Sequence, residues 1–122
     1  MFDVLADSTG VPCPELSEAD VAIVYLNEPG PGKIEGPIGV TVSTLGGTVK
    51  SPDFDSVVIR IYVQPITGIL VAQDRLDAVI EAVERRIEDT TSLFARSTWS
   101  ALYDPNNDLL VGESTLSMER TD

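Results

Sequence analysis

A pair of carboxylates, Asp53 and Asp55, is the first group of side chains that could carry chemistry. Two carboxylates in one loop can bind a hard cation such as Ca²⁺. A calcium-binding loop has more acidic ligands at a regular spacing, and the residues around this pair do not supply them. We therefore interpret the two aspartates as turn-forming residues and predict no metal site.

The single cysteine, Cys13, is the second candidate, as a nucleophile. A reactive thiolate needs a base within reach and usually a cationic neighbour. The nearest residues are Pro12, Pro14 and Glu15, and the glutamate would only raise the pKa of the thiol. One cysteine also allows no intrachain disulfide. The sequence therefore predicts an inert thiol.

Three glutamates, Glu81, Glu84 and Glu88, could act as paired acids on a predicted helix. A hydrolase needs carboxylates that face each other across a cleft, whereas these lie opposite the apolar stripe of the helix, where solvent is expected. The chain has no histidine, which removes the usual general base and the commonest metal ligand. We predict no enzymatic activity, no catalytic residue and no cofactor; a small enzyme that uses carboxylates alone is the weakest alternative.

A long loop over residues 27–37 contains three prolines and three glycines. It resembles a phosphate-binding loop only superficially, because Ile34 follows Lys33 where the Walker pattern has serine or threonine. A loop of this length favours a binding role. Trp99, the only tryptophan, is read either as an interface anchor or as a core aromatic residue. The predicted interaction residues are Glu28, Pro29, Pro31, Lys33, Ile34, Glu35, Trp99 and Tyr103.

The charge balance limits the possible partners. There are 20 acidic and 8 basic residues, for a formal net charge of −12. Such a surface repels phosphate groups and anionic membranes. No apolar stretch approaches the ~20 residues of a membrane-spanning helix. The N-terminus does not have the basic segment followed by an apolar run that is typical of a signal peptide, so we predict none. The only lysines are Lys33 and Lys50, a composition that suits either a haloarchaeal source or an acidic protein of a high-GC organism.

The chain has 122 residues, which predicts one domain. Hydrophobic periodicity and turn residues predict an α+β fold: a mostly antiparallel β-sheet, one main helix packed across it and a C-terminal hairpin. A helix that starts near Pro14 is the rival of the first predicted strand. The predicted elements are an irregular segment 1–20, strands 21–26, 38–43 and 56–64, a helix at about 70–88, and hairpin strands 97–103 and 109–120.

The strongest predicted strand alternates along its length. One face is expected to be aliphatic core, and the other to meet a partner or solvent. The core face has Val57, Ile59, Ile61 and Val63, and the other has Val58, Arg60, Tyr62 and Gln64. The core stripe of the helix is Leu76, Val79, Ile80, Val83 and Ile87.

Three motifs follow one another in a fixed order: VVIRIYVQ at 57–64, LDAVIEAVE at 76–84, and a Trp99-bearing strand that turns at Tyr103-Asp104-Pro105 into LVGESTL at 110–116. Over about residues 21–120 this order resembles the tail-terminator, or tail-completion, proteins of long-tailed bacterial and archaeal viruses. Members of that family usually open with a longer N-terminal helix, whereas residues 1–20 here are interrupted by prolines.

The resemblance implies a structural virion protein without catalysis, assembled in the host cytoplasm. It implies a hexameric ring at the head-proximal end of the tail tube, which stops tube growth. Its partners would be other copies of itself, the tail tube protein and the head–tail connector, with no membrane. DNA would pass through the ring without specific binding. The alternatives are a head–tail stopper or another neck protein and, in a different class, a cellular protein-binding module. A head-to-tail ring needs two different patches on each subunit, and the candidates are loop 28–37 and the edge of the terminal hairpin.

Overall fold

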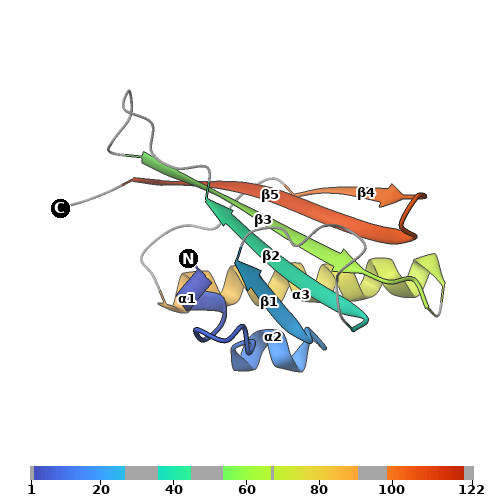
Figure 1. Ribbon diagram of the computed structural model, residues 1–122, viewed down its shortest axis with the longest axis horizontal. Coiled ribbons are helices and arrows are strands. Elements are labelled where there is room, and N and C mark those ends of the chain that lie inside the picture. Colours follow the sequence, from blue (N-terminus) through green and yellow to red (C-terminus); the bar gives the residue numbers. More distant parts are fainter. Residues whose placement is uncertain (1, 27–35, 45–53, 67, 91–98, 120–122) are drawn as a thin grey trace.

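The computed structural model describes residues 2–26, 36–44, 54–66, 68–90 and 99–119. Within these ranges the predicted helix and strands are present, with ends that differ by a few residues (Figure 1). The elements are α1 (Phe2–Leu5), α2 (Pro14–Glu18), β1 (Ile23–Leu26), β2 (Ile38–Thr44), β3 (Phe54–Val63), α3 (Ile69–Thr90), β4 (Ser100–Asp104) and β5 (Leu109–Glu119).

The strands form one sheet in the order β1-β2-β3-β5-β4. β1 runs parallel to β2, and the other neighbouring pairs are antiparallel. β3 lies in the centre, where its run of β-branched residues fits a strand that is covered on both sides. The predicted α+β class is therefore confirmed, with a mostly antiparallel sheet, one main helix and a hairpin of β4 and β5.

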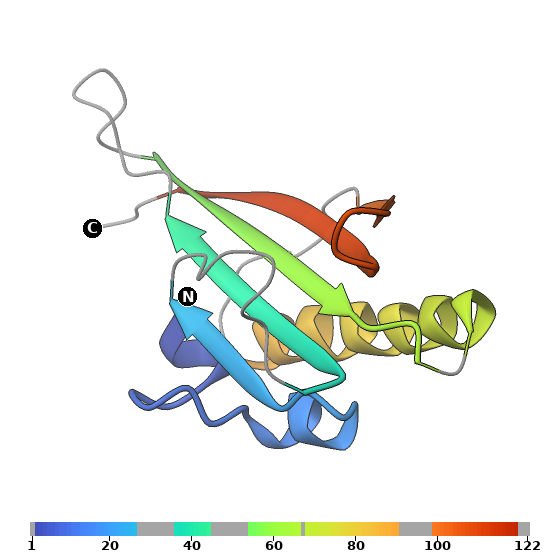
Figure 2. The ribbon, with the colours of Figure 1, turned by 45° about the vertical axis from the view of Figure 1, so that its right-hand side comes forward.

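α3 covers one face of this sheet (Figures 1 and 2). Of the predicted core stripe, four residues are fully buried and Ile80 is half-buried. They meet Ile59, Ile61 and Val63 of β3, which are fully buried as well. The helix comes close to β5 because position 112 is glycine: a Cβ atom there would lie 2.7 Å from Leu76 Cδ1. This helix–sheet layer is the main core of the protein.

The opposite face of β3 is more buried than expected. Val58 and Tyr62, predicted to meet a partner or solvent, are only 6% and 3% exposed. Tyr62 and Leu109 form a second, small apolar cluster there. The prediction that both residues are available to a partner is therefore wrong. An alternating pattern gives the two faces of a strand, but which of them stays open depends on the rest of the chain.

The sequence predicted an irregular segment over residues 1–20, but the structure has two short helices there, α1 and α2. α1 and α2 contact α3, and Pro14 opens α2 instead of only preventing a helix. Proline is well tolerated at this first position, because the N–H that it lacks would have no partner within the helix. Two elements thus coexist where we treated a helix near Pro14 and a strand at 21–26 as rivals.

Residues 6–12 form a compact loop against the outer edge of β1. The Asp7 carboxylate accepts hydrogen bonds from the backbone N–H groups of Thr9 (2.8 Å) and Val11 (3.0 Å). Hydrogen bonds, first of all from the Thr9 hydroxyl, hold the pKa of Asp7 below its usual value. The carbonyl of Gly10 then accepts a 2.9 Å hydrogen bond from the Val24 N–H. The loop therefore covers the β1 edge of the sheet.

We expect Gly10→Ala to destabilise the protein by about 2–3 kcal/mol. Gly10 has a φ of +88°, and a Cβ atom there would lie 2.7 Å from the Val24 carbonyl oxygen. Gly68→Ala is the matched control, because Gly68 also has a positive φ but nothing lies within 4 Å of its Cβ position. Its expected loss is about 1 kcal/mol. Urea unfolding measures both, and equal losses would contradict the close contact.

Candidate interaction surface

Cys13 lies in a structural contact between the N-terminal helices and α3. The thiol is buried, and this burial raises its pKa, so it stays protonated at neutral pH. Beside it, Arg86 Nε donates a 2.8 Å hydrogen bond to the Val4 carbonyl. Arg86 Nη1 also lies 3.5 Å from Glu15 Oε2. Arg86 therefore joins α3 to both short helices, and the arrangement contains no activated nucleophile.

The glutamates of α3 do not face one another across a cleft. Glu81 forms a 2.6 Å ion pair with Arg85 one turn away, and both side chains are mostly exposed. Glu84 Oε1 accepts a 2.8 Å hydrogen bond from Trp99 Nε1. Glu88 is exposed. Among the residues with described side chains, no three histidine, cysteine, aspartate or glutamate residues are grouped as metal ligands.

Six of the predicted interaction residues, namely Glu28, Pro29, Pro31, Lys33, Ile34 and Glu35, lie outside the described residues, as does Asp53. Their roles stay predictions. The side chain of Asp55 is likewise not described. Among the described helices, none combines the length and the apolar character that crossing a bilayer requires.

Trp99 lies just before β4, not within it as the predicted strand 97–103 implied. Its ring is partly buried against the main core, and its N–H is bound to Glu84 on α3. This is the position of a core aromatic residue whose polar atom has found a partner. Its role as an interface anchor stays a prediction.

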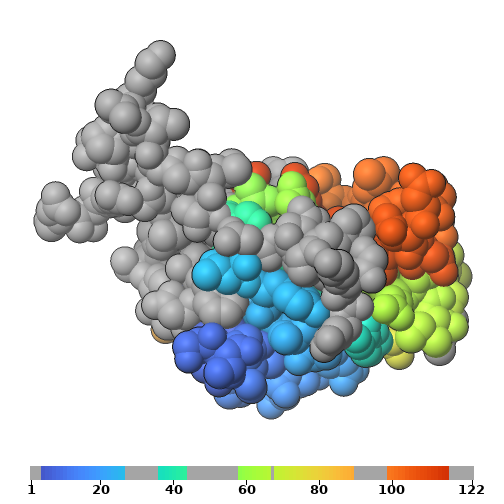
Figure 3. Space-filling model, in the orientation of Figure 1, coloured from blue at the N-terminus to red at the C-terminus, as the bar shows by residue number. Residues whose placement is uncertain are grey.

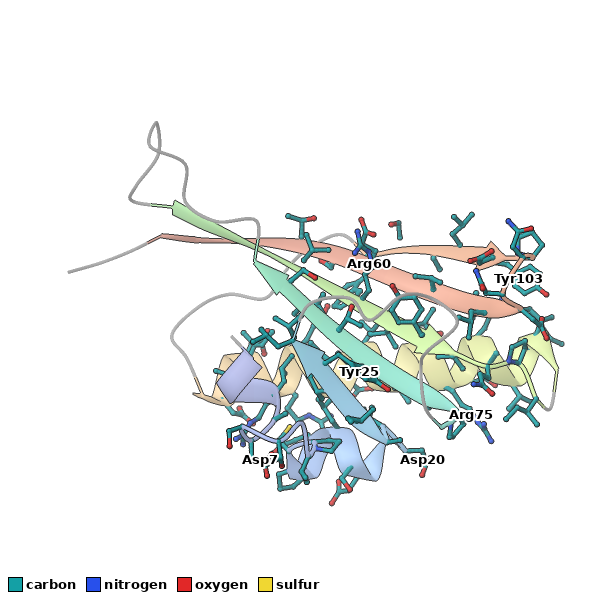
Figure 4. The ribbon with its side chains drawn as sticks, viewed as in Figure 1. Asp7, Asp20, Tyr25, Arg60, Arg75 and Tyr103 are labelled. Atoms are coloured by element: carbon teal, nitrogen blue, oxygen red, sulfur yellow. The ribbon has the colours of Figure 1, made fainter. Side chains whose placement is uncertain are left out.

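Tyr103 is exposed at the end of β4, as Figure 4 shows. Its hydroxyl donates a hydrogen bond to Asp108 Oδ1 across the hairpin turn. This hydrogen bond is the main reason that the pKa of Tyr103 is raised. Asp104 accepts hydrogen bonds from the Asn106 N–H (3.0 Å) and the Asn107 side-chain amide (2.8 Å), which lower its own pKa. The turn is therefore fixed by its own side chains.

A group of exposed apolar side chains surrounds the first turn of α3. Ile66 is 68% exposed and Leu70 is 74% exposed. Ile69 lines one hollow together with Pro65, Tyr103 and Asp108, so this group continues to the β4–β5 hairpin. Figure 3 shows the start of the helix and the hairpin side by side at the same end of the molecule. We call this the α3-start surface; it comprises Ile66, Ile69, Leu70 and Val71.

Sequence reasoning missed this surface, although a signal was present. Three consecutive apolar residues, Ile69, Leu70 and Val71, stand at the start of the helix. Successive helical residues are turned by about 100°, so three in a row cannot all face one core. A second apolar pair, Val11 and Leu26, lies at the β1 edge of the sheet, and each is 58% exposed. We call this pair the β1-edge surface.

On the sheet face away from α3, a groove of about 470 Å³ lies over β5, with residues of β3 and β4 on either side. Arg60 Nε and Glu113 Oε2 form a 2.7 Å ion pair in it, and the two residues are directly opposite in the β3–β5 register. Leu102 and Val111 supply the apolar part of the wall. A half-buried ion pair between neighbouring strands favours the observed register.

The two edges of the sheet differ. Val24 of β1 already donates its N–H to the loop that covers that edge. In β4, by contrast, the first four residues are exposed, and Leu102 is 73% exposed. Within the part of the chain that the structure describes, β4 pairs with β5 on one side only. An exposed edge strand with a large apolar side chain is a site at which another strand can pair.

We expect Trp99→Phe to reduce the free energy of unfolding by about 1–2 kcal/mol, because the hydrogen bond to Glu84 and part of the packed ring are lost. Glu84→Gln is the control, since its amide oxygen can still accept that hydrogen bond, and its loss should be smaller. Urea denaturation followed by circular dichroism measures both. A variant with unchanged stability but weaker self-association would instead make Trp99 an interface residue.

We expect Asp108→Asn to lower the pKa of Tyr103 towards its ordinary value, measured as phenol absorbance against pH with Tyr103→Phe as the reference. Since the folded-state pKa is raised, the stabilising contribution is fully present below about pH 10, the unfolded value. It is lost as pH rises through the folded pKa. An amide oxygen can still accept from the Tyr103 hydroxyl, so the variant tests the charge of the carboxylate, and an unchanged titration curve would contradict its effect on the pKa of Tyr103.

Comparison with known proteins does not assign the chain to a family. The sequence matches no protein-family model and no curated protein. Its function is therefore inferred from its own contacts, burial and charge.

Proposed function

We propose that this chain is a structural virion protein, a tail terminator that forms a hexameric ring at the head-proximal end of the tail tube. The ring would join the tube to the head-side connector and act without catalysis. The order of motifs from residue 57 to residue 116 supports this reading, and so do the surfaces of the subunit.

The single observation that carries the proposal is the presence of two separate apolar surfaces. The α3-start surface adjoins the β4–β5 hairpin, and the β1-edge surface lies at the other edge of the sheet. A ring built head to tail needs two different patches on each subunit, one for each neighbour. Burying a leucine side chain such as Leu70 contributes roughly 2 kcal/mol to such a contact.

The charge of the chain fits a ring through which DNA passes. With 20 acidic and 8 basic residues, most exposed charges are negative. On α3 the exposed acidic residues include Asp74, Asp77 and Glu81. A channel lined by such residues repels phosphate and would not retain the genome. The proposal includes a location in the virion neck. It also includes two partners, the tail tube protein and the head-side connector.

The test is the mass of the purified protein by light scattering, in low salt and in about molar salt, where repulsion is screened. We expect a closed species of six subunits or of a multiple of six. Leu70→Asp should remove that species, because it places an unpaired charge in a buried contact. Ser17→Asp is the matched control, since it adds the same charge on an exposed position of α2 outside both surfaces.

A mass that corresponds to six subunits in the wild type and in Ser17→Asp, but not in Leu70→Asp, supports the proposal. Open-ended polymers would retain the head-to-tail contact but contradict the closed ring. A monomer in both salt conditions favours the alternatives, which are another neck protein or a stand-alone binding module.

A further inference from the structure

The sequence offered the edge of the terminal hairpin as a ring contact, whereas the two apolar surfaces proposed for the ring do not include β4, whose own edge is exposed. In β4, Ser100 and Leu102 point to the sheet face away from α3. Ser100 is opposite Glu113 of β5, which is opposite Arg60 of β3. Leu102 is likewise opposite Val111, which is opposite Tyr62. Leu102 is among the most exposed large apolar residues that the structure describes. An edge of this kind needs a strand from another chain or a covering segment.

Extension of the sheet from β4 of one copy to β1 of the next is obstructed. Val24 in the middle of β1 already donates its N–H to the Gly10 carbonyl, at 2.9 Å. A strand arriving at this edge would have to displace the loop formed by residues 6–12. Of the two edges of the described sheet, the β4 edge is therefore the open one. A β4 strand can pair there with β4 of a second copy.

The sequence of β4 is self-complementary when two copies run antiparallel. In the register that pairs all five residues, Leu102 lies opposite Leu102 of the second copy. Ala101 then lies opposite Tyr103, and Ser100 lies opposite Asp104. Opposed side chains in such a pair have Cβ atoms about 4.5–5.5 Å apart. The two exposed Leu102 side chains thus cover each other, and no carboxylate faces a carboxylate directly.

We propose that two copies of the protein pair through β4 about a twofold axis at Leu102, which joins their sheets into one continuous sheet. This contact is isologous, whereas the ring contact is head to tail, and the two use different residues. The proposal therefore does not depend on the ring. If rings form as well, the same contact would link subunits of two rings.

The pairing is expected to be weak and to depend on salt. A five-residue edge is short, so the dissociation constant should be on the order of 10–100 µM. Each copy carries a formal charge of −12, and Asp104 and Asp108 flank the contact. Screening in about molar salt should strengthen the pair several-fold.

The test uses chains that carry Leu70→Asp, so that rings do not obscure the result, with masses measured by analytical ultracentrifugation in molar salt. We expect a monomer–dimer equilibrium for this background. Adding Leu102→Asp or Leu102→Lys should weaken it at least tenfold, because like charges then face each other across the axis. Leu102 is exposed, so neither change should affect folding, which circular dichroism checks.

Mixing the two charged variants distinguishes this register from other contacts. If residue 102 faces residue 102 of the second copy, the aspartate and lysine chains attract each other. A heterodimer should then form, while each variant alone stays monomeric. Masses that neither variant changes, or a mixture that stays monomeric, would overturn the proposal. A dimer in this background and in the wild type, without any closed species of six, would support the pairing and contradict the ring.

Discussion

The close approach of α3 to β5 is the contact on which the arrangement of the molecule depends. Leu76 can lie against the sheet because Gly112 has no side chain to hold the helix away. Ile61, which is paired with Gly112, is buried next to this contact, and two turns further along the helix Glu84 accepts a hydrogen bond from Trp99. The first turn of α3 extends past the end of β3 (Figure 1), and its apolar residues stay exposed there.

The same layer makes the two edges of the sheet unequal. The N-terminal segment contacts α3 and β1 together, through Arg86 on one side and the Gly10 carbonyl on the other. It can therefore cover only the edge near β1. β4 lies at the far edge, with three strands between it and β1, beyond the reach of that segment. One covered edge and one open edge restrict how copies of this chain can associate, because extension of the sheet in one direction is closed.

Much of the fold could be predicted from the sequence, because local patterns determine it. The alternation of Ile59, Ile61 and Val63 and the stripe from Leu76 to Ile87 identify the main core without reference to other parts of the chain. The burial of Tyr62 could not be predicted in this way, since it depends on which segments lie over that face. A helix that starts near Pro14 was considered only as the rival of the strand at 21–26; periodicity in so short a run could not show that both elements are present.

The candidate surfaces were harder to predict than the core. Exposed apolar residues carry no motif, and Leu102 alternates like any residue of a half-buried strand. Ile69 to Val71 gave a usable signal, because three adjacent helical residues cannot share one stripe. Tyr103 was predicted to lie at an interface, and the structure puts it at the border of the α3-start surface. The binding role of loop 28–35 stays a prediction, since its residues are not described.

Acidity and exposed apolar surface oppose each other in this protein, and their different dependence on salt decides which prevails. Repulsion between copies that each carry −12 acts over about 10 Å at 0.1 M salt and about 3 Å at 1 M. Burial of side chains such as Leu70 acts at contact, contributes roughly 25 cal/mol per Å², and is not screened. Where the solution is dilute in salt, repulsion keeps copies apart before the apolar groups can touch. In concentrated salt it fades before contact, so that any association of copies would then be determined by the apolar surfaces. The uncharged Ile66, Ile69, Leu70 and Val71, in a chain otherwise rich in carboxylates, are therefore the residues on which association should depend most strongly.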